Sequence, residues 1–252
     1  MTRILWVNPG EPPANLNEEF RQLLTREKEA STEVDVVSTG RGPRDLEYRY
    51  YEALVIPDTL HRLRQAEKEG YEGAVIGCFY DPGVEEAREL TNLIVIGPGE
   101  ASMRLASVLG HTFSVIVGRE KWIPQMRENV VRHGMEGRFA SFRAVDLPVC
   151  EMRADEAETA RRIERAARAA VEEDGAEVII LGCTMEYGFY QDLQQRLHVP
   201  VVDPVLAAFK TAEWLVGLKN RYGWSHSKVR AYEPPPEGQI RAWDLARQYG
   251  ID

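Results

Sequence analysis

Two cysteines stand at matching places in two stretches of the chain that read almost alike. Residues 69–79 are EGYEGAVIGCF and residues 174–184 are DGAEVIILGCT, and the two stretches align without a gap. The alignment pairs Gly77 with Gly182 and Cys78 with Cys183, each directly after a short apolar run. One Gly-Cys pair at a strand end would favour simple core packing, because free cysteine is among the most buried residue types. A core does not demand cysteine twice at equivalent places, so the match indicates a functional pair.

Both cysteines are expected just beyond the carboxyl end of a buried strand, where open α/β sheets bind ligands. If a helix follows each one, its N-terminal amides can lower the pKa of the thiol and bind an anionic oxygen. Two thiols facing each other across a cleft suit the chemistry of a racemase. One thiolate removes a proton from a carbon, and the opposing thiol returns a proton to the other face.

An enolate that forms beside a carbonyl needs hydrogen-bond donors. The backbone amides of Phe79 and Thr184 could supply them, together with the side chain of Asn8, which ends the first strand in VNPG. Asn8 could equally be a turn residue before Pro9. Cys150 has no counterpart in the repeat and is interpreted as a packing residue.

The composition excludes several classes of protein. The net charge is −9 and no basic stretch stands out, which argues against a nucleic-acid partner. No apolar run approaches the roughly 18 residues of a membrane span, and the first residues lack a signal-peptide pattern. Three cysteines are too few for a disulfide scaffold and favour a cytoplasmic protein. No C-x-x-C or H-x-x-x-H pair occurs, so no metal is expected.

Short β-branched runs alternate with charged helical segments, which is typical of parallel sheets covered by helices. The fold class predicted is α/β, with two pseudo-symmetric halves and the active cleft between them. The first half comprises residues 1–98 plus 205–252, and the second comprises 99–204. Strands are expected at 3–8, 33–38, 73–77, 92–97, 112–118, 139–145, 177–182 and 199–203.

Three segments between the strands have a predicted structure of their own. Residues 153–175 form the clearest amphipathic helix, with Gly175 where a helix C-terminus favours glycine. A helix at 205–218 is expected to return the chain to the first half. The tail 232–238, YEPPPEG, is expected to be extended.

The order and spacing of several motifs resemble the aspartate/glutamate/hydantoin racemase superfamily, most closely its hydantoin and allantoin racemases. The resemblance runs over most of the chain and rests on GCFYDPGVEEAREL (77–90), IGPGEASMRLASVLGHTFSVI (96–116), DGAEVIILGC (174–183), VPVVDPVLAAFKTAEWLV (199–216) and SKVRAYEPPP (227–236). It implies a cofactor-independent racemase of 5-substituted hydantoins or allantoin, with Cys78 and Cys183 as the acid–base pair. It also implies a small-molecule substrate, either a cyclic ureide or an amino-acid derivative. A homo-oligomer is expected.

The chain departs from the family pattern at three strand-end loops that should line the pocket. The second cysteine is followed by Thr184-Met185-Glu186 where the family has A-G-M. The first strand ends in NPG, with Gly10, where N-P-N-T is usual, and Gly118 lies where hydroxyl residues are common. These changes leave the two cysteines intact and bear on the identity of the substrate.

Several side chains near these loops have two readings. Glu186 could accept a hydrogen bond from a substrate N–H, but the first turn of a helix is favoured for it. Arg119 could pair with a substrate carboxylate, but an exposed loop arginine is favoured. Glu100 is expected to begin a helix. Tyr80, Tyr187 and Trp6 could form an aromatic wall or pack in the core.

Other functions on the same fold stay open. An amino-acid racemase, a maleate isomerase and an arylmalonate decarboxylase resemble the same superfamily. The presence of both cysteines argues against the decarboxylase, which uses one. A non-catalytic protein that binds a small molecule is the alternative outside enzymology.

Overall fold

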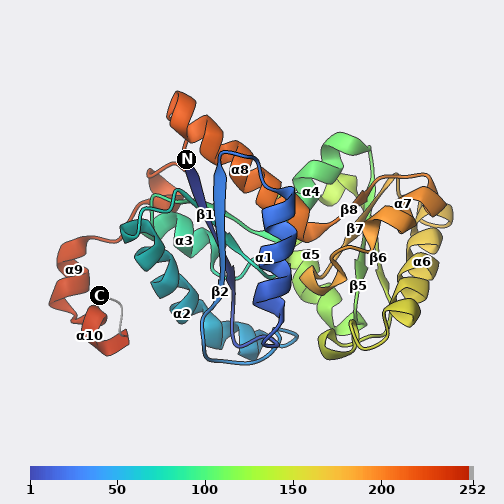
Figure 1. The fold of residues 1–252 in the computed structure, drawn as a ribbon, viewed down its shortest axis with the longest axis horizontal. Coiled ribbons are helices and arrows are strands. Elements are labelled where there is room, and N and C mark those ends of the chain that lie inside the picture. The colour runs from blue at the N-terminus through green and yellow to red at the C-terminus, as the bar shows by residue number, and fades with distance from the viewer. Residues whose placement is uncertain (250–252) are drawn as a thin grey trace. The chain divides into compact units, whose positions relative to one another are not determined.

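The computed structural model describes residues 1–249 and shows an α/β protein with two four-stranded parallel sheets flanked by helices (Figure 1). The chain divides into two compact units. The first unit contains Met1–Ile76, Pro82–Ile96 and the chain from Phe209 on, and the second contains Gly77–Asp81 and Gly97–Ala208.

These boundaries differ from those expected from the sequence in that residues 77–81, 97–98 and 205–208 lie with the second unit. The physical reason for the first difference is visible in the core. Phe79 and Tyr80 are buried in the same apolar cluster as the strands of the second sheet. The chain therefore leaves the first core immediately after its third strand.

The first sheet has the order β2-β1-β3-β4, and all its neighbouring strands are parallel. Strands β3 and β4 are buried along their whole length, as expected for parallel strands covered by helices. The strands are β1 (Thr2–Asn8), β2 (Thr32–Ser38), β3 (Gly73–Ile76) and β4 (Ile94–Ile96). The helices before residue 97 are α1 (Leu16–Glu27), α2 (Arg49–Lys68) and α3 (Val84–Leu90).

The second sheet has the order β6-β5-β7-β8 and is also parallel throughout. Its strands are β5 (Phe113–Val117), β6 (Phe139–Ala144), β7 (Val178–Leu181) and β8 (Val201–Val202). Its helices are α4 (Pro98–Leu109), α5 (Ile123–Arg132), α6 (Glu156–Glu172) and α7 (Tyr190–Leu197). Short 3₁₀ helices are η1 (Glu120–Trp122), η2 (Glu136–Arg138), η3 (Val149–Glu151) and η4 (Thr184–Glu186).

The two sheets repeat one another in topology and in register. In the first sheet Val7 of β1 pairs with Ile76 of β3, and in the second Ile116 of β5 pairs with Leu181 of β7. Each of those second partners stands one residue before the glycine of a Gly-Cys pair. The internal match seen in the sequence is therefore a match between equivalent central strands, and the predicted fold class is confirmed.

All eight predicted strands are present within one to two residues at each end. The predicted amphipathic helix is α6, whose side chain at Asp155 caps the helix by accepting from the Glu158 N–H at 3.0 Å. The predicted returning helix is α8 (Pro204–Tyr222). Gly175 has a φ of +72°, in the left-handed region that favours glycine after a helix.

The C-terminal tail is only partly extended. Beyond α8 come η5 (Arg230–Tyr232), α9 (Glu237–Ala242) and α10 (Leu245–Tyr249), with the prolines between η5 and α9. Lys228 ties the tail to α3, because its ammonium donates to the carbonyls of Arg88, Glu89 and Thr91.

Within residues 1–249, no helix is long and apolar enough to cross a membrane.

Candidate active site

The first cysteine lies in a tight turn after β3. The Asp81 N–H donates to the Cys78 carbonyl at 3.0 Å, and Asp81 itself has a φ of +57°. Pro82 and the left-handed Gly83 follow, so helix α3 begins only at Val84. The expected lowering of the thiol pKa depended on a helix directly after each cysteine, and at Cys78 that condition is not met because Pro82 and Gly83 come before the helix.

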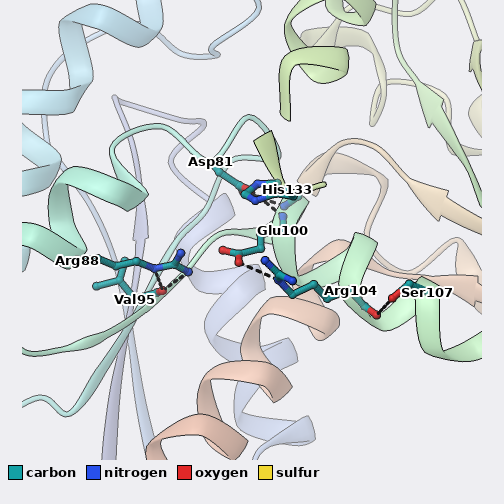
Figure 2. A network of polar contacts seen from close by, with 8 residues as sticks. Asp81, Arg88, Val95, Glu100, Arg104, Ser107 and His133 are labelled. Atoms are coloured by element: carbon teal, nitrogen blue, oxygen red, sulfur yellow. Dashed lines mark hydrogen bonds and ion pairs between the residues drawn. The ribbon is translucent and has the colours of Figure 1, made fainter. Parts of the chain in front are cut away.

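Asp81 fixes this turn to the start of α4. Its two carboxylate oxygens accept from the N–H groups of Gly99 and Glu100, at 2.8 and 2.7 Å. Figure 2 shows Asp81 beside Glu100 and His133. His133 Nε2 lies 3.6 Å from Asp81 Oδ2. Burial raises the pKa of Asp81, although His133 and the two helix amides act in the opposite direction. The turn that carries Cys78 is thus held by a buried carboxyl that caps a helix.

Glycine is required where α4 meets this turn. A Cβ on Gly97 would lie 2.3 Å from the Asp81 side chain, and a Cβ on Gly99 would lie 2.5 Å from the Phe79 carbonyl oxygen. Asn129 adds another tie, because its Nδ2 donates to the Tyr80 carbonyl at 2.7 Å. The GPG stretch of the sequence therefore makes room for the first cysteine loop.

The second cysteine lies directly before η4. The Gly182 N–H donates to the Ile116 carbonyl at 2.7 Å, and a Cβ on Gly182 would lie 2.4 Å from that oxygen. Reciprocal hydrogen bonds then close the turn. The Glu186 N–H donates to the Cys183 carbonyl at 2.9 Å and also to the Cys183 sulfur, and the Cys183 N–H donates to Glu186 Oε2 at 3.2 Å. This is a capping box with cysteine at the N-cap.

Two buried acids support this second loop. Glu186 is completely buried, and burial raises its pKa well above 4.5, with the nearby Asp203 acting in the same direction. Asp203 accepts from the Gly188 N–H at 2.8 Å and from the Val205 N–H at 2.9 Å. Burial raises the pKa of Asp203 also. The Cys183 loop is therefore held at both ends by carboxyl groups.

The structure brings the two cysteine loops together within the second unit. Cys183 is a buried member of the apolar cluster of that unit, and Cys78 packs against the same cluster as a partly exposed side chain. Between the loops, Thr184 Oγ1 donates to the Gly77 carbonyl at 3.5 Å. The residue after one cysteine thus contacts the residue before the other. None of the three cysteines forms a disulfide, and Cys150 is exposed in η3, so its interpretation as a packing residue is wrong.

The other predicted site residues have the following places. Asn8 is 3% exposed, accepts from Trp6 Nε1 at 2.8 Å and donates from Nδ2 to Asn17 Oδ1 at 2.9 Å. It ends β1 in the first unit and is not a simple turn residue. Phe79 and Thr184 are buried, and within residues 1–249 their N–H groups donate to no other protein group.

Gly118 is enclosed at the end of β5. Its carbonyl accepts from the Leu147 N–H at 2.9 Å, and a Cβ would lie 2.2 Å from the Trp122 ring and 2.6 Å from Met152. A hydroxyl side chain does not fit there without rearrangement of Trp122. The departure from the family pattern at this position is therefore a packing change as well as a change of chemistry.

The ambiguous side chains are resolved in part. Trp6 is core, with an edge-to-face contact to Phe20 at 5.4 Å, and Glu100 lies in the first turn of α4 paired with Arg104 (Figure 2). Arg119 is half-buried at the start of η1. Tyr187 lies under the guanidinium of Arg153 at 4.0 Å.

Sequence reasoning missed four residues that position the loops: Asp81, Asn129, His133 and Asp203. Their partners are backbone groups or side chains distant in sequence, for which no local pattern exists. The D-P-G segment was the available signal for Asp81. In the part of the chain that the structure describes, no group of three or more His, Cys, Asp or Glu side chains is arranged to hold a metal ion.

The structure thus has two parallel sheets of the same strand order, with a Gly-Cys pair after the equivalent central strand of each. The chain belongs to the Asp/Glu/hydantoin racemase family, which it matches over residues 14–212. It is 36% identical to the hydantoin racemase of Paenarthrobacter aurescens over 238 residues, covering 94% of this chain and 99% of that protein. It is 34% identical to the hydantoin racemase of Rhizobium meliloti over 229 residues, covering 91% and 93%.

Solved structures agree with this assignment. The allantoin racemase from Klebsiella pneumoniae superposes with a TM-score of 0.87 and 30% identity, covering 96% of this chain and 98% of that one. The protein is therefore an isomerase, a racemase of the hydantoin racemase family.

Proposed function

We propose that this enzyme racemises 5-substituted hydantoins or allantoin without a cofactor, with one of Cys78 and Cys183 removing a proton from the substrate and the other returning one. The observation that carries the proposal is the placement of these cysteines. They follow equivalent strands in identical register, and their loops contact each other in one unit. The named activities of the relatives, hydantoin racemase and allantoin racemase, support the substrate class.

The proposed reaction has two proton transfers and no net redox change. One cysteine, as thiolate, takes the proton from C5 of the ring, and the C–H electron pair moves into the adjacent carbonyl to form an enolate. The opposing cysteine, as thiol, gives its proton to the other face of C5 and becomes the thiolate. The electrons return from the enolate oxygen to carbon. The enzyme ends with the two protonation states exchanged, ready for the opposite enantiomer.

The enolate oxygen requires donors that are already in position. The N–H groups of Phe79 and Thr184 each follow a cysteine directly, and neither has an acceptor among the described residues. We propose them as the main donors, with Asn8 and the enclosed Gly118 as further substrate contacts. Asn8 Nδ2 has a second N–H beyond the one given to Asn17.

The test is a panel of enantiopure 5-substituted hydantoins and allantoin, followed by polarimetry. Wild type and Cys150→Ser, which changes an exposed cysteine outside the repeat, are expected to bring the rotation to zero at similar rates. Racemisation of free glutamate or aspartate instead would move the assignment to an amino-acid racemase. Saturable binding of a hydantoin with no turnover of any substrate would favour a non-catalytic protein.

Three broader features belong to the same proposal. The two units are proposed to be the two domains of the enzyme, and its three cysteines, none of them in a disulfide, suit a reducing cytoplasm. The active form is proposed to be a homo-oligomer, because α4 exposes Leu105, Val108 and Leu109 on one face. Light scattering at micromolar concentration tests this, and a mass equal to a single chain would refute it.

A further inference from the structure

Each cysteine is followed, three residues later, by a buried acid. Continuing the gap-free alignment by two residues pairs Asp81 with Glu186, and their exposed fractions are 4% and 0%. Their carboxyl groups, however, have different partners. Asp81 reaches away to the N–H groups at the start of α4. Glu186 folds back and accepts from the N–H of Cys183 itself.

The surroundings of Glu186 do not suit a charged carboxylate. Its Oε1 is buried and, among the described residues, has no hydrogen-bond partner. No ion pair of the described residues includes Glu186, and the charge that acts on its pKa is that of another acid, Asp203, which raises it. The cation Arg153 lies over the ring of Tyr187, and its charge lowers the pKa of Asp203. A buried ionised carboxylate without a cation is strongly unfavourable in free energy.

We propose that Glu186 is a positioning residue for Cys183, which holds the sulfur against the N–H of its own turn and does so as an uncharged acid. The proposal rests on the proposed racemase function of Cys183 and deepens it. The carbonyl oxygen of the acid accepts from the Cys183 N–H, and the buried Oε1 carries the proton. The raised pKa of Glu186, caused mainly by burial, agrees with this assignment.

An uncharged acid matters for the chemistry of the sulfur. The N–H of Glu186 donates to Cys183 Sγ, and such a bond favours the thiolate. A carboxylate at the same place would oppose the thiolate by repulsion between like charges. Glu186 as a neutral acid keeps the turn closed, and with it the donor, without adding that repulsion. At the equivalent place after Cys78, the carboxyl of Asp81 accepts from the N–H groups of Gly99 and Glu100 instead, so the two carboxyls support their loops by different contacts.

The test measures the thiols directly and needs no substrate. The protein is alkylated with iodoacetamide between pH 5 and 10, and the modification of each cysteine is followed by peptide mass spectrometry. Glu186→Ala and Glu186→Met both remove the acceptor, and the second preserves most of the side-chain volume. Glu186→Gln keeps the acceptor and has no charge. Glu164→Ala, on the surface of the same unit, controls for loss of an acid.

The expected result is specific to one cysteine. In Glu186→Ala and Glu186→Met, the alkylation profile of Cys183 moves up by about one pH unit, while that of Cys78 stays in place. In Glu186→Gln the profile of Cys183 returns close to wild type. Glu164→Ala changes neither cysteine.

Two outcomes overturn the proposal. An unchanged Cys183 profile in Glu186→Met refutes the positioning role, and a shift to lower pH in Glu186→Gln shows that the wild-type acid is charged. Failure of the proposed function is distinguishable, because wild-type protein would then racemise no hydantoin although its Cys183 profile still responded to Glu186.

Discussion

At the scale of single residues, the two sulfurs carry the proposed reaction. Replacing Cys78 or Cys183 by serine exchanges a thiol for a much weaker acid, and both transfers are needed for inversion. Each variant is expected to lose racemase activity by ~10²–10⁴-fold, the range that general acid–base groups contribute. The measurement is the initial rate of loss of optical rotation, with Cys150→Ser as the matched control.

The same variants should separate the two faces of the substrate. The remaining thiolate in each variant can still exchange the C5 hydrogen of one enantiomer with solvent deuterium, without inversion. The other variant is expected to exchange the opposite enantiomer. A serine variant that racemises at the wild-type rate would contradict the two-thiol mechanism.

Glu186 also predicts a pH dependence of stability. The pKa of Glu186 in the folded protein is raised well above 4.5. The stability that the protonated side chain contributes is therefore fully present below pH 4.5. The contribution is lost as the pH rises through the folded-state pKa. The side chain introduced in Glu186→Gln cannot ionise. The free energy of unfolding of this variant should therefore increase relative to that of wild type as the pH rises. Urea denaturation at a series of pH values from 4 to 9 measures this gain.

Glu164 provides a control of opposite sign. Hydrogen bonds from Arg196 and Arg168 lower its pKa, so its contribution is present above the usual pKa and lost as the pH falls. At neutral pH the free energy of unfolding of Glu164→Gln should therefore be slightly lower than that of wild type, and the difference should be small because surface ion pairs contribute little to stability. A flat difference between Glu186→Gln and wild type across the series would show that Glu186 does not titrate differently on folding.

At the scale of elements, the N-terminus of α4 should tolerate no side chain where it meets the first cysteine loop. Gly99→Ala places a Cβ 2.5 Å from the Phe79 carbonyl oxygen and 2.9 Å from Asp81 Oδ2. Overpacking of this kind costs about 1–3 kcal/mol, which exceeds the roughly 1 kcal/mol that alanine gains over glycine in a helix. Gly137→Ala, with no atom within 4 Å of the added Cβ, is the control. Equal unfolding midpoints for the two variants would contradict this prediction.

The elements themselves were largely predictable from the sequence, whereas the ties between them were not. Apolar β-branched runs such as those of β1 and β5 are read directly as buried strands. The capping of α4 by Asp81 joins a side chain to N–H groups 18 and 19 residues later, and no periodic pattern encodes such a contact. The Cys183–Glu186 capping box escaped notice because cysteine is not among the usual N-cap residues.

At the scale of the whole molecule, the sequence repeat and the topological repeat are one property. The strand orders β2-β1-β3-β4 and β6-β5-β7-β8 are the same order shifted by four strands. A gap-free alignment of eleven residues was enough to predict two halves of the same kind, because it spans strand, glycine and cysteine together, but it did not predict the strand order. The acids three residues after the cysteines, Asp81 and Glu186, have different hydrogen-bond partners. The repeated fold therefore carries two cysteine loops that are built differently.

Two separate thiols make a prediction about the fate of the transferred hydrogen. When a protiated enantiomer reacts in D₂O, one cysteine takes the hydrogen and the other, already exchanged with solvent, delivers deuterium to the opposite face. At low conversion the product enantiomer should therefore carry one deuterium at the stereocentre, while the recovered substrate stays unlabelled. Chiral chromatography with mass spectrometry measures both, in buffer with EDTA because no metal is expected to take part. The Cys78→Ser/Cys183→Ser double variant gives the uncatalysed background. Product that keeps its original hydrogen would show that a single base serves both faces, and the pairing of Cys78 with Cys183 would then need another explanation.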